Sequence, residues 1–80
     1  MEINLTTIDL RATGKQISRA RKRAGLSVRD LQEALGLSAP NAIYRWQRGE
    51  SLPRLDHLVI LASLLHVPMD DLISVRISTH

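Results

Sequence analysis

The chain has 80 residues, of which 44 % are hydrophobic, enough for one small core but not for a cavity that holds a large cofactor. We therefore expect a single domain that binds no cofactor and is not an enzyme, because its residues supply no catalytic arrangement, metal-ligand spacing or phosphate-binding loop. The chain contains no cysteine and its longest apolar run, residues 58–65, is too short to span a bilayer, so we expect a cytoplasmic protein without a membrane segment.

The net charge of +3 is distributed unevenly along the chain. Residues 11–48 contain nine basic and two acidic residues and carry +7, whereas residues 1–10 and 49–80 each carry −2. A field of one sign on part of a small domain attracts polyanions, although exposed helices also use arginine for solubility. The charge pattern alone is compatible with nucleic-acid binding and with a solvated surface.

The first part of the chain predicts an arm and two helices. Residues 1–13 alternate apolar and polar side chains, which fits a short strand or an extended arm, and Gly14 marks a boundary. Residues 15–24 predict a helix whose apolar face includes Ile17 and Ala20. Ser27 and Asp30 have the spacing of a capping box, and the helix that follows them ends at Gly36.

A third helix should begin near Ala39 or Pro40 and end at Arg48, with Ile43 and Trp46 on its buried side. A fourth helix follows from Arg54. Its predicted apolar stripe consists of Leu55, Leu58, Val59, Ala62 and Leu65, and Ile60, Leu61 and Leu64 lie outside that stripe. A helix that is apolar on more than one side is either deeply buried or covered by a partner, and in so small a domain the second alternative favours a dimer.

The last part of the chain predicts one more helix and a strand. We interpret His66 as a C-cap, and Asp70 and Asp71 fit the first turn of a short fifth helix. Residues 74–78 alternate like a strand that pairs with the N-terminal arm, within one chain or between two. The expected organisation is an arm or short strand at 1–13, a helical domain at 14–74 and a tail or short strand at 75–80.

The second and third predicted helices are joined by a tight turn that contains a glycine. Such a pair, flanked by supporting helices, allows its second helix to enter a DNA major groove. Three side chains on that helix are candidates for reading bases: Asn41 suits adenine, Arg45 suits guanine, and Tyr44 can reach a phosphate or a thymine methyl group. The candidates for phosphate contacts are Ser27, Arg29, Ser38, Arg48 and Arg54. A plain helical hairpin in a protein-interaction module is the alternative.

The segment 14–74 resembles the phage-repressor-like (Xre-type) helix-turn-helix family. The matching residues include Ile17, Arg21, GLS at 25–27, LGLS at 35–38, Ile43, RW at 45 and 46, RGES at 48–51, and LLHVPMDDLI at 64–73. The resemblance implies an all-α, five-helix, lambda-repressor-like domain. It also implies a homodimer that binds a double-stranded DNA operator and represses transcription. An antitoxin that mainly binds a protein partner, with DNA binding secondary, is the rival interpretation.

The chain departs from the family pattern at several positions. Gln47 stands where relatives commonly have a glutamate that pairs with the arginine at Arg21, and we expect Arg21 to keep a structural role. The interval from Gly36 to Ile43 is one residue longer than in most members, and Gln32 replaces a small residue. We expect these two changes to be coupled, because a longer turn would move the third helix away and make room for Gln32.

Overall fold

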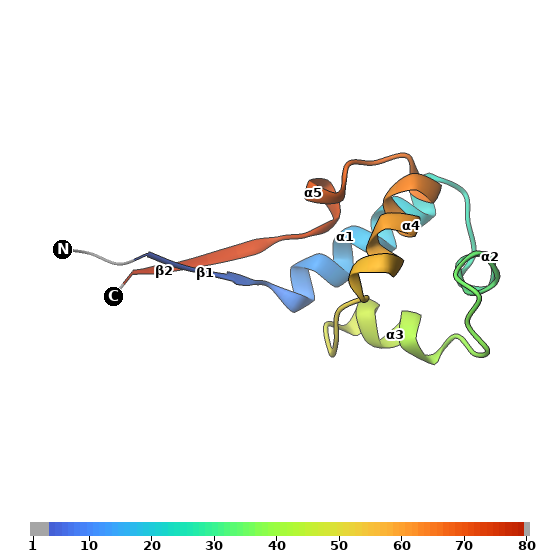
Figure 1. Cartoon of the computed structure of the whole chain (residues 1–80), viewed down its shortest axis with the longest axis horizontal. Helices are drawn as coiled ribbons and strands as arrows, with labels where there is room; N and C mark the ends of the chain where they lie inside the picture. The colour runs from blue at the N-terminus through green and yellow to red at the C-terminus, as the bar shows by residue number, and fades with distance from the viewer. Residues whose placement is uncertain (1–3, 80) are drawn as a thin grey trace.

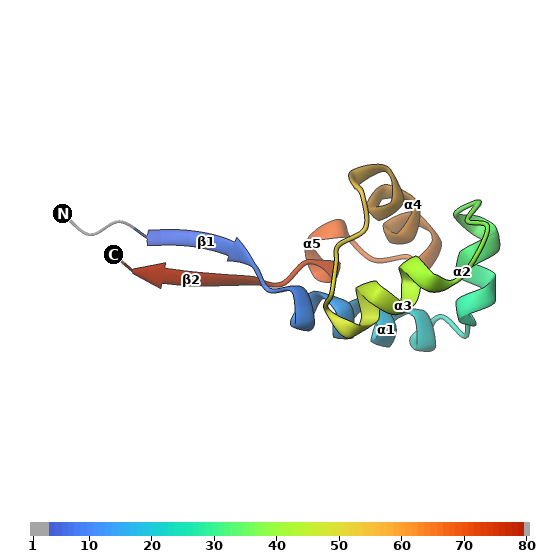
Figure 2. The same ribbon diagram turned by 90° about the horizontal axis from the view of Figure 1, so that it is seen from below.

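A computed structural model describes residues 4–79 of the chain, which form five helices and a two-stranded sheet (Figure 1). This confirms the predicted five-helix fold with short terminal strands. The elements are β1 (Asn4–Ile8), α1 (Leu10–Arg23), α2 (Val28–Ala34), α3 (Asn41–Arg48), α4 (Leu55–Leu65), α5 (Met69–Leu72) and β2 (Val75–Thr79). The helices form a body from which the two strands extend, so the molecule measures 48 × 23 × 19 Å (Figure 2). No helix within residues 4–79 has the length and apolar content needed to cross a membrane.

Helix α1 begins earlier than the sequence predicts. Asp9 is its N-cap and accepts a hydrogen bond from the backbone N–H of Ala12 at 3.0 Å, so the helix starts at Leu10 rather than at Lys15. Gly14 is buried inside α1 and is not a boundary. It lies against the end of α3, where a larger residue would overlap the backbone of Trp46. The absence of a side chain at Gly14 therefore allows α1 and α3 to approach each other closely.

The predicted helix-turn-helix forms, although α2 ends at Ala34 rather than at Gly36 and α3 begins at Asn41 rather than near Ala39 or Pro40. Ser27 accepts a hydrogen bond from the N–H of Asp30 at 3.0 Å, and the Asp30 carboxylate accepts one from the N–H of Ser27 at 2.8 Å. This reciprocal capping box starts α2. Gly36, with a φ of 68°, allows the chain to turn after α2, and Gly49 ends α3 in the same left-handed region.

The core is aliphatic apart from Trp46 and joins all five helices. Its most deeply buried apolar side chains are Ile17, Leu31, Ile43, Leu61 and Leu72, one from each helix. Trp46 is only 4 % exposed, so the prediction that it belongs to the core is confirmed. Because α1 contacts both α3 and α5, it is the central support of the body.

The apolar stripe predicted for α4 is wrong in part. The buried residues of this helix are Leu58, Leu61 and Leu65. Leu55 and Val59, which the prediction placed in the stripe, are 70 % and 51 % exposed. The helix is apolar on several sides, so periodicity did not identify which side faces the core. The outward side of α4 therefore carries large apolar residues.

The two strands pair antiparallel, with Ile8 opposite Val75 and Thr6 opposite Ile77. The predicted pairing of the terminal segments thus occurs within one chain, and β2 begins one residue later than expected. The base of this ribbon is bound to α1. The N–H of Asp9 donates to the carbonyl of Ser74 at 2.8 Å, and the N–H of Ser74 donates to the buried hydroxyl of Thr13 at 2.9 Å. At the other end of the body, His66 is the left-handed C-cap of α4, as predicted.

Candidate nucleic-acid interface

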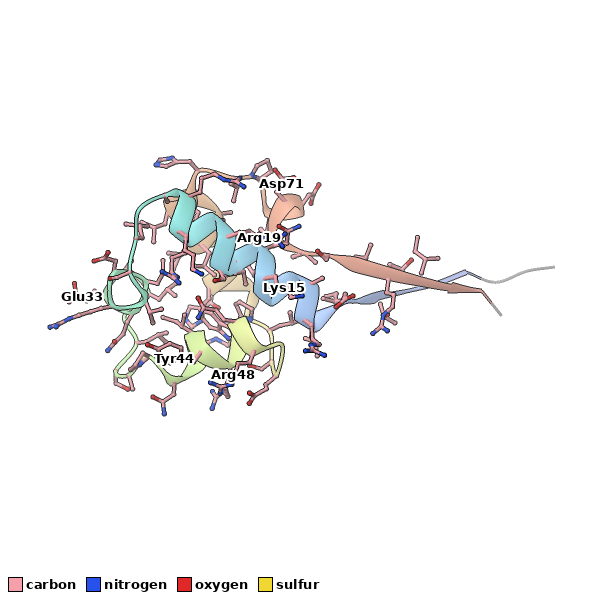
Figure 3. All side chains as sticks on the ribbon, turned by 180° about the vertical axis from the view of Figure 1, so that it is seen from behind. Lys15, Arg19, Glu33, Tyr44, Arg48 and Asp71 are labelled. Carbon is pink, nitrogen blue, oxygen red and sulfur yellow. The ribbon has the colours of Figure 1, made fainter. Side chains whose placement is uncertain are left out.

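Helix α3 has a buried side and an open side. Ile43 and Trp46 anchor it in the core, and Tyr44 on the open side is 44 % exposed. The three predicted base-reading residues, together with Arg48, line one shallow groove of about 350 Å³ on this side. Figure 3 shows Tyr44 and Arg48 along the outer side of the helix. The structure therefore brings the expected polar set of Asn41, Tyr44 and Arg45 together on one exposed surface.

The N-termini of α2 and α3 differ in their hydrogen bonding. The capping box occupies the backbone N–H groups of Ser27 and Asp30 at the start of α2. Pro40 at the start of α3 provides no side-chain cap, and Ser38 lies exposed just before it. The first backbone N–H groups of α3 are therefore the better placed of the two sets to receive an anion.

Each of the three predicted phosphate-contacting arginines has a carboxylate neighbour. Arg29 lies 3.4 Å from Glu33, Arg54 lies 3.0 Å from Asp56, and Arg48 pairs with Glu50. All three pairs are largely exposed, and such pairs contribute little to stability. A phosphate can therefore replace the carboxylate partner of each arginine at a small cost in free energy. Arg29 and Arg54 lie outside the α3 groove, on α2 and at the start of α4.

The electrostatic environment at the end of α3 is positive. A hydrogen bond from Arg48 holds the pKa of the Glu50 carboxyl below its ordinary value, and the charge of Arg45 lowers that pKa further. The same hydrogen bond raises the pKa of Arg48. Glu50 is therefore ionised at neutral pH and offsets part of the positive charge of Arg45 and Arg48 at the end of α3.

Arg21 holds the C-terminal end of α3 against the corner between α1 and α2. Its Nε donates to Oε1 of Gln47 at 3.1 Å, and its Nη1 donates to the carbonyl of Leu26 at 2.8 Å. The side chain is half-buried, which confirms the expected structural role. Gln47 thus supplies an acceptor but no compensating charge.

The sequence alone predicts no role for Arg11 and Lys15. Both lie in the first two turns of α1 and line a groove with Gln47, Arg48 and Glu50. The signal that could have identified Arg11 was the Asp9 cap, because a helix starting at residue 10 places Arg11 and Lys15 one turn apart on the same side.

Comparison with known proteins places this geometry in a family. The profile of the Xre-like helix-turn-helix family matches residues 17–72, whereas no curated protein sequence matches the chain. The restriction-modification controller protein C.AhdI from Aeromonas hydrophila is a similar solved structure, with a TM-score of 0.70 and 26 % identity. The match covers 80 % of this chain and 96 % of that protein.

Two further solved structures share the fold. The clp gene regulator ClgR from C. glutamicum has a TM-score of 0.69 and 21 % identity, over 82 % of this chain and 84 % of that one. The BldD DNA-binding domain from S. venezulae has a TM-score of 0.67 and 21 % identity, over 82 % of this chain and 97 % of that one. With the family match covering most of the chain, this protein belongs to the Xre-like helix-turn-helix family of DNA-binding transcriptional regulators.

Proposed function

We propose that the protein is a sequence-specific regulator that inserts α3 into the DNA major groove and represses transcription as a homodimer. The observation that carries the proposal is the division of α3 into two sides. Ile43 and Trp46 fix the helix in the core, and Asn41, Tyr44 and Arg45 are exposed on its outer side. A recognition helix needs this combination, because its base-reading side chains must be held rigidly yet be free of the core.

Within this proposal the polar residues have separate tasks. Asn41 pairs with adenine and Arg45 with guanine, through the two-point hydrogen bonds that each side chain can form. Tyr44 contacts a phosphate or a thymine methyl group. Ser27, Arg29, Ser38, Arg48 and Arg54 bind phosphates and fix the orientation of the domain on the duplex.

The proposed dimer rests on apolar residues that the single chain leaves exposed. Leu55 and Val59 on α4 are 70 % and 51 % exposed, and Val75 and Ile77 on the ribbon are 56 % and 65 % exposed. We expect α5, the outer side of α4 and the terminal strands to form the contact between two copies. Sedimentation equilibrium at high micromolar concentration tests this, and a strictly monomeric mass would contradict it. Repression would follow from steric occlusion of a promoter.

Selection of bound duplexes from a random pool at near-physiological salt tests the function. Near-physiological salt is required because nonspecific binding by a basic domain dominates at low ionic strength. Enrichment of an inverted repeat is the expected result, and the spacing of its halves would give the dimer geometry. Failure to enrich any sequence would contradict sequence-specific binding.

Arg45→Ala and Arg48→Ala form a matched pair for separating base reading from positioning. We expect Arg45→Ala to relax the preference at one or two base pairs. Arg48→Ala should weaken binding to all sequences and lower the salt slope by about one. Identical behaviour of the two variants would contradict the assigned tasks.

A protein-interaction module such as an antitoxin is the second candidate. The exposed apolar side chains of α4 favour it, because a partner protein could cover the same surface that we assign to the dimer. Co-purification with one stoichiometric partner, combined with no enriched duplex, would support this alternative.

A further inference from the structure

The groove on α3 continues beyond the helix-turn-helix. The α3 groove shares Arg48 with the groove lined by Arg11 and Lys15. That second groove shares Arg11 and Lys15 with a third groove of about 600 Å³, which Arg76 of β2 also lines. Figure 3 shows Lys15 on α1 near Arg48 on α3. One continuous surface therefore runs from the exposed side of α3, across the start of α1, to the base of the ribbon.

Among the residues that the structure describes, this surface carries a net positive charge. Within residues 4–79, none of the ion pairs involves Arg11, Lys15 or Arg76. Two acidic residues lie along the same surface: Glu50 pairs with Arg48, and Asp9 caps α1 through a backbone N–H, which does not neutralise a carboxylate. Five basic residues line the three grooves, so the formal net charge of the surface is +3.

The local packing holds the backbone of Arg11 and of the start of β2 close to α3 and α1. Gly49, at the end of α3, approaches α1 so closely that a Cβ there would lie 2.7 Å from the Cα of Arg11. The start of α1 therefore cannot shift independently of the recognition helix. Arg76 is held in a similar way, because the Ser74 hydrogen bonds to Asp9 and Thr13 lie two residues before it.

We propose that Arg11, Lys15 and Arg76 bind phosphates of the same duplex whose bases α3 reads. The inference rests on the proposed DNA-binding function and extends its interface to the start of α1 and the ribbon. A polymer of phosphates is the favoured ligand, because the grooves are shallow and open and would not retain a small anion. A row of separated cations on a continuous surface matches the repeated charge of a nucleic-acid backbone.

The ribbon can serve both this contact and the proposed dimer. Ile8, Val75 and Ile77 lie on one face of the two strands. The cross-strand pair of Thr7 and Arg76 lies on the opposite face, since side chains alternate along a strand. A second copy on the apolar face would therefore leave Arg76 free to face DNA.

The test measures the affinity of the full chain for its selected duplex by fluorescence anisotropy at several salt concentrations. The variants are Arg11→Gln, Lys15→Ala and Arg76→Ala, of which the first keeps most of the side-chain stem next to Gly49. We expect each variant to bind about fivefold more weakly at 0.15 M salt and to lower the slope of log K against log salt by about one. Base preference in the duplex selection should not change.

Lys22→Ala is the matched control, because Lys22 is an exposed basic residue in the last turn of α1 that lines none of the three grooves. It removes the same charge and should leave the salt slope unchanged. Equal slopes for the three variants and the unmodified chain would overturn the inference, as expected if the surface binds an acidic protein instead. In that case continued sequence-selective binding by the unmodified chain would leave the proposed function intact. Failure of the unmodified chain to select any duplex would contradict the proposed function itself.

Discussion

Gly14 of α1 lies so close to Trp46 of α3 that no side chain fits between the two helices. A Cβ at residue 14 would overlap the carbonyl oxygen of Trp46 and lie 2.9 Å from that of Gln47. Both atoms belong to backbone, so the overlap cannot be relieved by a rotamer change. We expect Gly14→Ala to reduce the free energy of unfolding by about 3 kcal/mol. Urea denaturation, followed by the fluorescence of the single, buried Trp46, measures this loss.

Gly36→Ala is the control for that substitution. Gly36 has a positive φ of 68°, but within the described part of the chain no atom beyond its two sequence neighbours lies within 4 Å of the position of its Cβ. Only backbone strain opposes this change, and we expect a loss of about 1 kcal/mol. Equal losses for the two variants would show that the close approach of α1 and α3 is not the cause.

The Arg21–Gln47 hydrogen bond predicts opposite effects of Gln47→Glu on stability and on DNA affinity. A carboxylate would keep the acceptor and compensate the charge of half-buried Arg21. We therefore expect the free energy of unfolding to rise by about 1 kcal/mol. The same carboxylate would line the basic groove beside Arg48, where it would repel phosphates. Affinity for the selected duplex should therefore fall. Urea denaturation and anisotropy titration measure the two effects separately.

Gln47→Leu separates the acceptor from the charge. It removes the acceptor and leaves Arg21 with only the carbonyl of Leu26, so we expect a loss of about 1 kcal/mol in stability. A Gln47→Glu variant that is no more stable than the unmodified chain would contradict the predicted gain from charge compensation.

The capping box predicts a specific dependence of stability on pH. The backbone N–H of Ser27, and then its hydroxyl, lower the pKa of the Asp30 carboxyl in the folded chain. The stabilisation is therefore complete above the unfolded pKa of about 3.9 and disappears as pH falls through the lower folded pKa. We expect the stability difference between the unmodified chain and Asp30→Asn to shrink as pH falls from 7 to 2. Urea denaturation of both proteins at several pH values measures this difference in the free energy of unfolding.

Ser27→Ala distinguishes the two causes of that shift. This variant keeps the backbone N–H that bonds Asp30 but loses the hydroxyl cap of α2. We expect it to lose about 1 kcal/mol at neutral pH while retaining most of the acid sensitivity contributed by Asp30. An Asp30→Asn difference that stays constant over the whole pH range would contradict the assigned role of the carboxylate.

Local signals made the helix-turn-helix predictable. The spacing of Ser27 and Asp30, the turn at Gly36 and the stop at Gly49 each depend on only a few neighbouring residues. The buried positions of Ile43 and Trp46 follow from helical periodicity within one short segment. The exposed α3 residues could therefore be grouped on one surface before the structure was known.

Features that depend on distant parts of the chain were not predictable in this way. A glycine in a helix is normally unfavourable, and only contact with α3 explains Gly14. The sequence predicts that α1 starts at Lys15, so it does not predict that Arg11 lies in this helix next to Gly49. On α4, apolar residues surround the helix, so the buried position of Leu61 follows from packing rather than from pattern.

The coupling expected between Gln32 and the long turn has a structural counterpart. Nε2 of Gln32 donates a hydrogen bond to the carbonyl of Leu37 at 3.4 Å, so the side chain contacts the backbone of the turn. We expect Gln32→Ala alone to lose about 1 kcal/mol, and deletion of Ala39 alone to destabilise the chain by drawing α3 toward Gln32. In the double variant the smaller side chain should accommodate the shorter turn, so that about 1 kcal/mol of the summed loss is recovered.

A double-mutant cycle with urea denaturation measures this coupling free energy. Gln16→Ala with the same deletion is the matched control, because Gln16 is a partly buried glutamine on α1, where it lines a groove with residues of α5. Its effect should add to that of the deletion, since Gln16 lies beside α5 rather than beside the turn. If the double variant, Gln32→Ala with Ala39 deleted, were less stable than either single variant, the coupling would be contradicted. Recovery only in the Gln32 cycle would show that this side chain and the length of the turn determine together how far α3 stands from α2.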